Sequence, residues 1–426
     1  MNRIHLHGQE SAKLHPSEVS ASLRPPRIGI VTVWFERGAA YVSRAYHSVL
    51  SKHFDVYIYA RGGEKYAIGD PVWDGSRVTW GKRNWTGSID LQHLLTWIER
   101  NRLNVILFNE QQDWTPVLSL MQSDLIVGAY VDYYTEETVP FFSLYDFLLC
   151  NTRRHLSVFK WHPNALFIPW GTDPSLFRPR ERSCNTDKIV FFHSAGMGGV
   201  NLRKGTDLAV KAFHDLDSRN CRLVIHSQVP LLKFGQEIEG VVAADERIEF
   251  VQETVGAPGL YHLGDVYLYP SRLEGIGLTV PEAIASGLPV ITANSRPMSE
   301  FVLENQTGRL ARIASERRRS DGYYWPERSC SVQHLSEIMS GFVERRADLW
   351  RWRAAARDYA LQYLDWKKNS RNLPQLLLGM SPNPDRGCLA EALHMDIADY
   401  QKRIWPYNSR RYRAWSRIKR LLRLSQ

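Results

Sequence analysis

Residues 269–292, which read YPSRLEGIGLTVPEAIASGLPVIT, decide the fold of this chain. The stretch begins as an apolar strand, continues through a loop that contains Gly275 and Gly277, and enters a helix with Pro281 in its first turn. Gly287 ends this helix before the next strand. A glycine loop before a helix N-terminus allows close backbone approach and presents free N–H groups to an anion. The stretch therefore predicts an anion-binding loop at the carboxyl edge of a parallel sheet.

Two carboxylates accompany this loop, because Glu274 lies in it and Glu282 lies in the first turns of the predicted helix. Ionised carboxylates accept hydrogen bonds and sugar hydroxyls donate them, so both side chains suit a sugar next to a phosphate. The spacing alone decides little, since about one or two such pairs occur by chance in a chain of this length. The strand, glycine loop, helix and strand around the pair favour a binding site over solvated surface acids.

Short apolar segments alternate with helix-sized segments along most of the chain. Strands are predicted at residues 27–34, 54–59, 105–108, 125–131, 147–150, 166–170, 189–193, 223–226, 248–251, 266–269 and 289–292. Helices are predicted at residues 39–52, 88–101, 206–216, 257–263, 280–286, 298–302 and 332–364. Such alternation produces parallel sheets covered by helices on both faces, and 426 residues accommodate two such doubly wound α/β domains.

Two segments show no periodic pattern of apolar residues. Residues 171–187 contain Pro174 and Pro179 and are predicted to form the link between the two domains. Residues 317–326 are charged and rich in turn formers, and they are predicted to form an exposed insertion in the second domain.

The composition, with 44% hydrophobic and 23% charged residues, is typical of a globular protein and excludes disordered, collagen-like and disulfide-scaffold classes. No apolar run reaches the roughly 18 residues of a membrane span, and the polar, flexible segment 1–26 lacks the apolar core of a secretory signal. The five scattered cysteines are expected to be free thiols in a reducing compartment. We therefore expect a cytoplasmic protein.

The net charge of +9 is concentrated at the C-terminal end. Residues 402–426 hold nine Lys or Arg and no Asp or Glu, so residues 1–401 hold 45 basic and 45 acidic residues and balance. Aromatic and aliphatic residues at near-helical spacing alternate with arginines over 409–424, which is typical of a basic amphipathic helix on an anionic membrane surface. The alternative is a helix packed on the body with a solvated basic face. No nucleic-acid partner is expected, because the body contains no recognised nucleic-acid-binding fold.

Residues 27–378 resemble the retaining glycosyltransferases of the two-domain GT-B fold, family 4, whose E-x7-E region matches the stretch 269–292. The phosphate-binding motif of these enzymes resembles Arg203-Lys204-Gly205, and their inter-domain linker resembles residues 167–179. At Asp365-Trp366 the chain resembles the point where theirs crosses back to the first domain. The resemblance implies two facing Rossmann-like domains, which are an acceptor-side domain 27–170, completed by a crossover helix 366–378, and a nucleotide-sugar-binding domain 171–365. The charge and spacing described above predict that residues 379–426 form a basic amphipathic tail.

The resemblance also implies roles for individual residues. Glu282 would bind the ribose hydroxyls of a nucleotide-sugar, and Glu274 would contact the transferred sugar. Lys204, helped by Arg203, would neutralise charge that develops on the leaving diphosphate. The backbone positions that would hold the diphosphate are Gly275, Ile276, Gly277, Leu278, Thr279 and, from the first domain, Gly38.

Two positions depart from the family pattern. The family often has an Arg about six residues before the Lys, where this chain has Gly198. The family also commonly has a His after the fourth strand of the first domain, where this chain has the sequence Tyr130-Val-Asp-Tyr-Tyr-Thr135. Asp132 is the candidate catalytic replacement, with a capping or core aspartate as the alternative. Glu110, which follows the strand 105–108, is a second candidate for contact with the acceptor.

The leading hypothesis is a metal-independent glycosyltransferase without a cofactor, which moves a sugar from a nucleotide-sugar to a glycan or lipid-linked acceptor in polysaccharide or glycoconjugate synthesis. Asp215 and Asp217 match the D-x-D motif of metal-dependent enzymes, but they fall at a predicted helix end and suit a solvated terminus better. The alternatives are a nucleotide-sugar epimerase or a sugar phosphorylase of the same fold, or a catalytically idle nucleic-acid binder with a basic tail. The tail would hold the enzyme at the inner face of a membrane.

Overall fold

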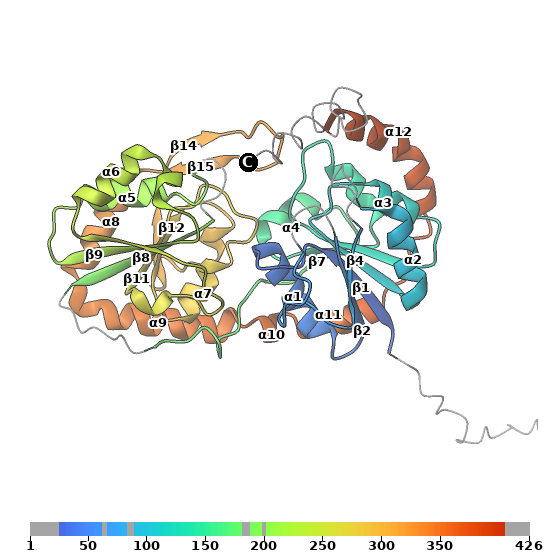
Figure 1. The fold of residues 1–426 in the computed structure, drawn as a ribbon, viewed down its shortest axis with the longest axis horizontal. Coiled ribbons are helices and arrows are strands. Elements are labelled where there is room, and N and C mark those ends of the chain that lie inside the picture. Colours follow the sequence, from blue (N-terminus) through green and yellow to red (C-terminus); the bar gives the residue numbers. More distant parts are fainter. Residues whose placement is uncertain (1–24, 62–65, 83–88, 181–187, 198–201, 405–426) are drawn as a thin grey trace, which may run out of the picture.

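The structure, a computed structural model, describes residues 25–61, 66–82, 89–180, 188–197 and 202–404. These residues form two α/β domains side by side, each built around a parallel sheet with helices on both faces (Figure 1). The predicted fold class, two doubly wound Rossmann-like domains, is confirmed. Apolar runs such as RIGIVT at Arg27–Thr32 lie at the centre of the sheets, because only such runs can be buried on both faces.

The first domain has a seven-stranded sheet with the order β3-β2-β1-β4-β5-β6-β7. Its strands are β1 (Arg27–Thr32), β2 (Asp55–Ala60), β3 (Val78–Trp80), β4 (Val105–Asn109), β5 (Ile126–Tyr130), β6 (Phe147–Cys150) and β7 (Ala165–Phe167). Its helices include α1 (Gly38–Leu50), α2 (Leu91–Asn101), α3 (Thr115–Ser119), the 3-10 helix η1 (Val139–Leu144) and α4 (Arg153–Phe159). The strand order reverses beside β1, so the carboxyl ends of β1, β4 and β5 form the edge where such sheets bind ligands.

The second domain has a six-stranded sheet with the order β10-β9-β8-β11-β12-β13. Its strands are β8 (Ile189–Gly196), β9 (Cys221–Ser227), β10 (Ile248–Gln252), β11 (Val266–Tyr269), β12 (Val290–Ala293) and β13 (Gly308–Ala311). Its helices include α5 (Thr206–His214), α6 (Gln236–Ala244), α7 (Thr279–Ala285), α8 (Val332–Glu344) and α9 (Leu349–Tyr363).

Two helices predicted in the second domain are shorter in the structure. The segment 257–263 contains only a 3-10 helix, η4 (Tyr261–Leu263), because Pro258 and Gly259 form a turn before it and Gly259 adopts a φ of +71°. The segment 298–302 contains the 3-10 helix η5 (Met298–Glu300), which begins directly after Pro297. Each segment is therefore a connection between strands that contains a single 3-10 turn.

The chain passes between the domains twice, and the two crossings run side by side. The N–H of Thr172 donates to the carbonyl of Leu364 at 2.7 Å, and the N–H of Trp366 donates to the carbonyl of Thr172 at 2.9 Å. A Cβ atom on Gly171 would lie 2.5 Å from the Leu364 oxygen, so only glycine permits this approach. After the crossing, α10 (Trp366–Asn369) and α11 (Leu373–Leu378) pack on the first domain, where the ring of Trp366 lies 4.6 Å from that of Trp170.

Within the segment 379–426 the structure contains α12 (Arg386–Ile404), which packs against the first domain (Figure 1). Ile397 and Tyr400 are buried in the first domain's core, and the buried Arg386 pairs with Asp146 at 2.7 Å. Residues up to 404 therefore belong to that domain. Residues 405–426, which carry the whole amphipathic pattern predicted over 409–424, lie outside the described residues, as do residues 1–24. None of the helices in the described part of the chain is long and apolar enough to cross a membrane.

A two-stranded antiparallel hairpin, β14 (Ile313–Arg317) and β15 (Glu327–Cys330), projects from the second domain toward the first (Figure 1). The loop between the strands was expected to be exposed. Asp321 and Gly322 are exposed, but residues 323–325 are half-buried against the first domain, where the N–H of Tyr324 donates to the carbonyl of Tyr134 at 2.9 Å. The expectation is wrong for these three aromatic residues because they pack at the boundary between the domains.

Candidate functional site

The predicted anion-binding loop lies between β11 and α7, at the carboxyl edge of the second sheet. Gly277 has a φ of +85°, a conformation that favours glycine. A Cβ atom on Gly275 would lie only 2.1 Å from Oδ1 of Asp132, which belongs to the first domain. The glycine at 275 is therefore required by the close approach of the two domains. Ile276 in the same loop is buried, and Thr279 begins α7.

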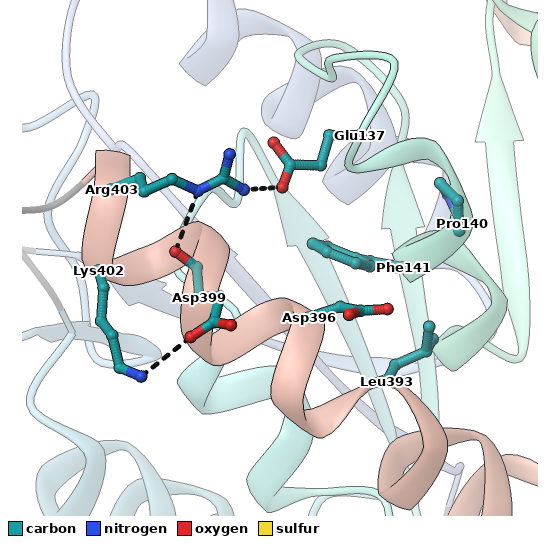
Figure 2. Close-up of a pocket in the computed structure, with 8 residues that line it drawn as sticks. All are labelled: Glu137, Pro140, Phe141, Leu393, Asp396, Asp399, Lys402 and Arg403. Atoms are coloured by element: carbon teal, nitrogen blue, oxygen red, sulfur yellow. Dashed lines mark hydrogen bonds and ion pairs between the residues drawn. The ribbon is translucent and has the colours of Figure 1, made fainter.

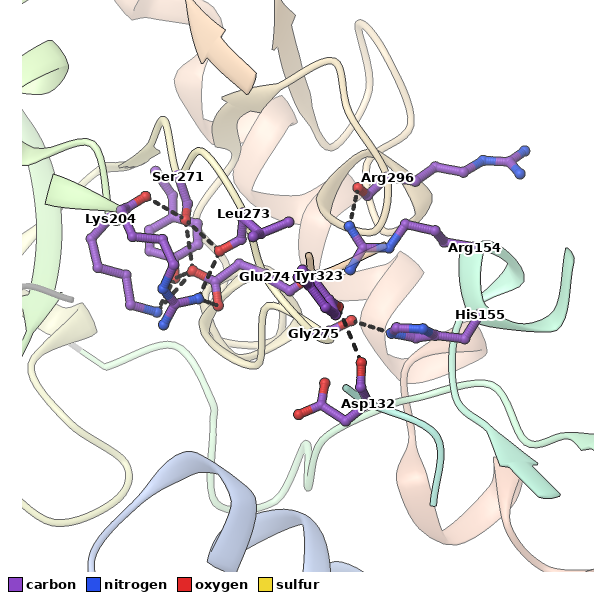
Figure 3. A network of polar contacts seen from close by, with 12 residues as sticks. Asp132, Arg154, His155, Lys204, Ser271, Leu273, Glu274, Gly275, Arg296 and Tyr323 are labelled. Carbon is purple, nitrogen blue, oxygen red and sulfur yellow. Dashed lines mark hydrogen bonds and ion pairs between the residues drawn. The ribbon is translucent and has the colours of Figure 1, made fainter. Parts of the chain in front are cut away.

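Glu274 is the centre of a buried polar network at the base of this loop (Figure 3). Its Oε1 accepts hydrogen bonds from Nζ of Lys204 at 2.9 Å, Oη of Tyr269 at 2.8 Å and Oγ of Ser271 at 2.6 Å. Its Oε2 accepts one from Nη1 of Arg203 at 3.1 Å. Because Oε1 already has three donors, further hydrogen bonds to this carboxylate would go to Oε2.

The charges in this network determine its protonation. Burial raises the pKa of Glu274, but Arg203 and Lys204 lower it more, and the net pKa lies well below its ordinary value. Burial lowers the pKa of Lys204, while the ionised Glu274 opposes this effect. Two cations therefore surround one carboxylate, which leaves an excess positive charge beside the loop.

A tight turn places the two cations. Leu202 and Gly205, on either side of Arg203 and Lys204, both have positive φ, at +56° and +73°. A Cβ atom on Gly205 would lie 2.2 Å from the carbonyl oxygen of Pro270, so the turn packs directly on the end of β11. The predicted Arg-Lys-Gly motif and the predicted loop thus come together in space. Gly198, the position of the departure from the family pattern, lies outside the described residues.

Glu282 lies in α7 and has a different environment from Glu274. Its Oε2 accepts a hydrogen bond from Oη of Tyr261 at 2.6 Å. Burial raises the pKa of Glu282 to about 7, and the hydrogen bond from Tyr261 and the charge of Lys204 only partly oppose this. Near neutral pH this carboxyl group therefore exchanges a proton readily, whereas Glu274 is fixed in its ionised form.

Asp132 and Glu110 lie together on the first-domain side. They follow β5 and β4, which are neighbouring strands, and their side chains are hydrogen-bonded to each other. Burial raises the pKa of Asp132 to about 7, and the negative charge of Glu110 contributes. Arg37 and Arg61 each lie 3.7 Å from Oε2 of Glu110. The pair is a partly protonated carboxyl site opposite Gly275.

Gly38, the remaining predicted position, begins α1 in the first domain. A Cβ atom on Gly38 would lie 3.7 Å from Cδ1 of Leu278 in the second domain, so the two predicted backbone positions face each other. Asp215 and Asp217, in contrast, lie exposed past the end of α5. Within the described ranges no group of three or more His, Cys, Asp or Glu side chains could hold a metal ion.

Three functional candidates were missed by the sequence prediction: Arg154, His155 and Glu300. Arg154 donates to the backbone carbonyls of Glu274 and Arg296, and the Nε2 of His155 lies 3.0 Å from the carbonyl oxygen of Gly275 (Figure 3). The carboxylate of Glu300, in η5, accepts hydrogen bonds from the N–H groups of Arg153 at 2.6 Å and Arg154 at 2.8 Å. The one local signal for Arg154 and His155 is their position, because α4 follows the carboxyl end of β6 and has Thr152 as its N-cap.

A separate hollow of about 530 Å³ lies between α12 and η1 (Figure 2). Phe141 and Leu393 line it, and four of its five charged residues form two ion pairs. Lys402 pairs with Asp399 at 3.0 Å, and Arg403 pairs with Glu137. None of the predicted site residues lines this hollow.

Two facing Rossmann-like domains, joined by a chain that crosses between them twice, define the GT-B fold, and solved structures agree. The sucrose-phosphate synthase of Thermosynechococcus elongatus superposes with a TM-score of 0.66 at 16% identity, over 83% of this chain and 98% of that one. WaaG, a glycosyltransferase involved in lipopolysaccharide biosynthesis, superposes with a TM-score of 0.59 at 15% identity, over 83% of this chain and 100% of that one. The predicted GT-B fold is confirmed.

Residues 189–318, which include Lys204, Glu274 and Glu282, match the model of the family described as "Glycosyl transferases group 1". The lipopolysaccharide core biosynthesis mannosyltransferase LpsB of Rhizobium meliloti is 32% identical over 33% of this chain and 43% of its own length. A GDP-mannose-dependent α-(1-6)-phosphatidylinositol monomannoside mannosyltransferase of Mycolicibacterium smegmatis is 26% identical over 50% of this chain and 56% of its own length. The chain thus matches about half the length of these relatives.

Proposed function

We propose that this protein is a retaining glycosyltransferase of the E-x7-E type, family 4, which transfers a sugar from a nucleotide-sugar to a glycan or lipid-linked acceptor. The proposal rests above all on the cations Arg203 and Lys204, which the ionised Glu274 holds beside the loop that faces Asp132. Negative charge develops on the leaving diphosphate in the transition state, and cations already fixed beside it stabilise this charge and lower the activation barrier.

The charges around the loop suit each part of the donor. Cleavage of the bond to the diphosphate builds positive charge on the sugar and negative charge on phosphate. Lys204 and Arg203 would stabilise the phosphate, together with backbone N–H groups from Gly275 to Thr279 and at Gly38. Glu282 would accept hydrogen bonds from the ribose hydroxyls, and Oε2 of Glu274 would accept one from the transferred sugar.

The first domain would supply the group that faces the reacting sugar. Asp132, in its ionised form, would stabilise the positive charge that develops there, and Glu110 would contact the acceptor. Their shared hydrogen bond means that one carboxyl group can hold the proton while the other is charged.

The names of the relatives support a mannosyl donor and a lipid-linked acceptor for this chain, because both relatives are mannosyltransferases and one acts on a phosphatidylinositol mannoside. Since Arg203 and Lys204 supply the positive charge, we propose that transfer needs neither a metal nor a cofactor.

The test is a thermal-unfolding screen with GDP, UDP, GDP-mannose and UDP-glucose, followed by product analysis with EDTA present throughout. Bound nucleotides are expected to raise the midpoint by mass action, and Lys204→Ala should weaken that rise. Transfer to a lipid-linked acceptor with the anomeric configuration of the donor retained supports the proposal. An epimerised donor, or sugar phosphate formed from inorganic phosphate, would contradict it in favour of an epimerase or a phosphorylase.

Removal of residues 405–426 is expected to weaken binding to anionic vesicles and to leave nucleotide binding unchanged. Lys402 and Arg403 are already paired with carboxylates of the first domain (Figure 2), and the remaining unbalanced positive charge of the sequence lies in the removed residues. Co-sedimentation with phosphatidylserine-containing vesicles measures the effect, and neutral phosphatidylcholine vesicles are the control. We propose that residues 405–426 bind the inner membrane face and that the rest of the chain binds the nucleotide. Loss of nucleotide binding in the truncated protein would contradict this proposal.

A further inference from the structure

A row of hydrogen bonds leaves the second domain, passes through the first and returns to the second. It begins at Trp325 in the β14–β15 loop, whose Nε1 donates to Oη of Tyr134 at 2.6 Å. The Oη of Tyr134 lies 2.8 Å from Nδ1 of His155 in α4. The Nε2 of His155 lies 3.0 Å from the carbonyl oxygen of Gly275, in the loop beside Glu274.

The chemistry of its first member sets the direction of the whole row. An indole N–H can only donate, so Trp325 donates to the oxygen of Tyr134. The hydroxyl proton of Tyr134 is then free to point to Nδ1 of His155, which must accept it. A neutral imidazole with an accepting Nδ1 carries its proton on Nε2, and this N–H donates to the carbonyl of Gly275. The row therefore specifies one tautomer of His155.

The surroundings of His155 keep it neutral. Burial lowers the pKa of His155 to about 3, and the adjacent Arg154 contributes to this. Tyr134 and His155 are both completely buried. Removal of one partner from a buried row of this kind destabilises the protein, because water cannot replace the missing hydrogen bond.

Packing around the row holds the same two surfaces together. The rings of Tyr133 and Tyr323 stack at 5.1 Å with an interplanar angle of 16°, and Oη of Tyr323 donates to the carbonyl of Asp132 at 3.1 Å. The guanidinium of Arg154 lies 5.1 Å from the ring centre of Trp325 and also donates to the carbonyl of Glu274. The hairpin loop thus contacts the segment that carries Asp132 and reaches the glycine loop through α4.

We infer that Trp325, Tyr134 and His155 are positioning residues, which form a clasp between the domains and fix the carbonyl of Gly275 and its loop for binding a nucleoside diphosphate. This inference rests on the proposed function. It makes the hairpin β14–β15 part of the binding site, although none of its described residues is among the predicted diphosphate contacts. It also means that the loop reaches its binding conformation only when the domains are together.

The binding test compares Tyr134→Phe with Tyr59→Phe by titration with GDP and UDP. Both changes remove a hydroxyl that meets Nδ1 of a histidine, since Oη of Tyr59 lies 2.9 Å from Nδ1 of His93. Tyr134→Phe is expected to raise the dissociation constant roughly tenfold, the equivalent of one lost hydrogen bond, and Tyr59→Phe to leave it unchanged. Equal affinities for Tyr134→Phe and wild type would overturn the inference.

Two further variants separate positioning from general stability. The terminal amide of His155→Gln can reach the carbonyl of Gly275 and should retain more affinity than His155→Asn, whose shorter amide cannot. A double-mutant cycle of Trp325→Phe and Tyr134→Phe should be non-additive, because both act through one row. Equal losses in the two amide variants, or full additivity in the cycle, would indicate that the clasp is merely structural.

A nucleotide-free measurement keeps the inference separate from the proposed function. In ¹⁵N-histidine NMR of the full chain, His155 is expected to show a protonated Nε2 and an unprotonated Nδ1 between pH 6 and 8. The opposite tautomer would overturn the clasp. If wild type binds neither GDP nor UDP while this tautomer is found, the clasp's role in nucleotide binding fails together with the proposed function, and only the hydrogen-bond row stands.

Discussion

Glu274→Gln is expected to lower the rate of sugar transfer by about 10²- to 10³-fold and the free energy of unfolding by about 2–3 kcal/mol. The carboxylate is the shared partner of Arg203 and Lys204, and glutamine removes the charge that both cations require. In either orientation the amide would also turn its N–H toward Arg203 or Lys204, which can only donate. Both cations are partly exposed, at 28% and 20%, so the loss of stability should fall below the full cost of an uncompensated buried charge.

Denaturant unfolding at pH 7 measures the stability difference, and initial rates with a saturating donor measure the effect on transfer. Glu249→Gln is the matched control, because Glu249 pairs with Arg222 at 2.7 Å on the surface of the same domain, where such pairs contribute about 0–1 kcal/mol. The pKa of Glu274 is lowered by folding, so its contribution is present above the ordinary carboxyl pKa and is lost only in acid. Equal stability of the Glu274→Gln and Glu249→Gln variants at pH 7 would refute the central role given to this carboxylate.

The parts of the site that could be predicted lie in continuous stretches or at strand ends. Glu274 and Glu282 belong to a strand-loop-helix pattern that local residue preferences specify, and Lys204 belongs to a short motif before α5. Asp132 was a candidate because it follows the predicted strand 125–131, where the family that the chain resembles commonly has a His, and side chains in such positions gather at one edge of a parallel sheet. Such rules say which edge a residue occupies, and they require no knowledge of how the domains meet.

The residues that could not be predicted act across the boundary between the domains. The roles of Tyr134, His155 and Trp325 depend on two contacts between the domains, Trp325 with Tyr134 and His155 with Gly275, and each of these contacts joins residues more than 100 positions apart. The helix predicted at 257–263 failed for a local reason, since its apolar spacing was given more weight than Pro258-Gly259. Strand β3, three residues of intermediate burial at Val78–Trp80, was missed because it is too short for a period-2 pattern to be recognised.

Glu282→Gln is expected to stabilise the nucleotide-free protein at pH 8 by about 2–3 kcal/mol and to have no effect near pH 4. Folding raises the pKa of Glu282 from an ordinary 4.5 to about 7. Between these values the folded protein holds a proton that the unfolded chain has released, so stability from the protonated form is complete below pH 4.5 and is lost as the pH rises through 7. Glutamine cannot ionise, and its carbonyl can still accept the hydrogen bond from Tyr261.

Urea unfolding of both proteins at pH 5, 6, 7 and 8 measures this difference, which should grow with pH. Glu246→Gln serves as the control, because Glu246 is exposed in the same domain and undergoes the same change of side chain. A constant difference between Glu282→Gln and wild type across the range would show that folding does not raise the pKa of Glu282.

The same substitution should weaken binding of the donor, and this combination distinguishes a binding carboxylate from a structural one. Hydrogen bonds from the ribose hydroxyls to an ionised carboxylate are charge-assisted and contribute about 1.5–3 kcal/mol, so affinity for GDP and UDP should fall by roughly 10- to 100-fold in the variant. If Glu282 served packing alone, its replacement would stabilise the protein and leave the affinity for GDP and UDP unchanged. Residues at binding sites often lower the stability of the ligand-free protein, because they are selected for binding. A variant that is more stable at pH 8 but binds GDP and UDP more weakly would therefore identify Glu282 as a ligand-binding residue.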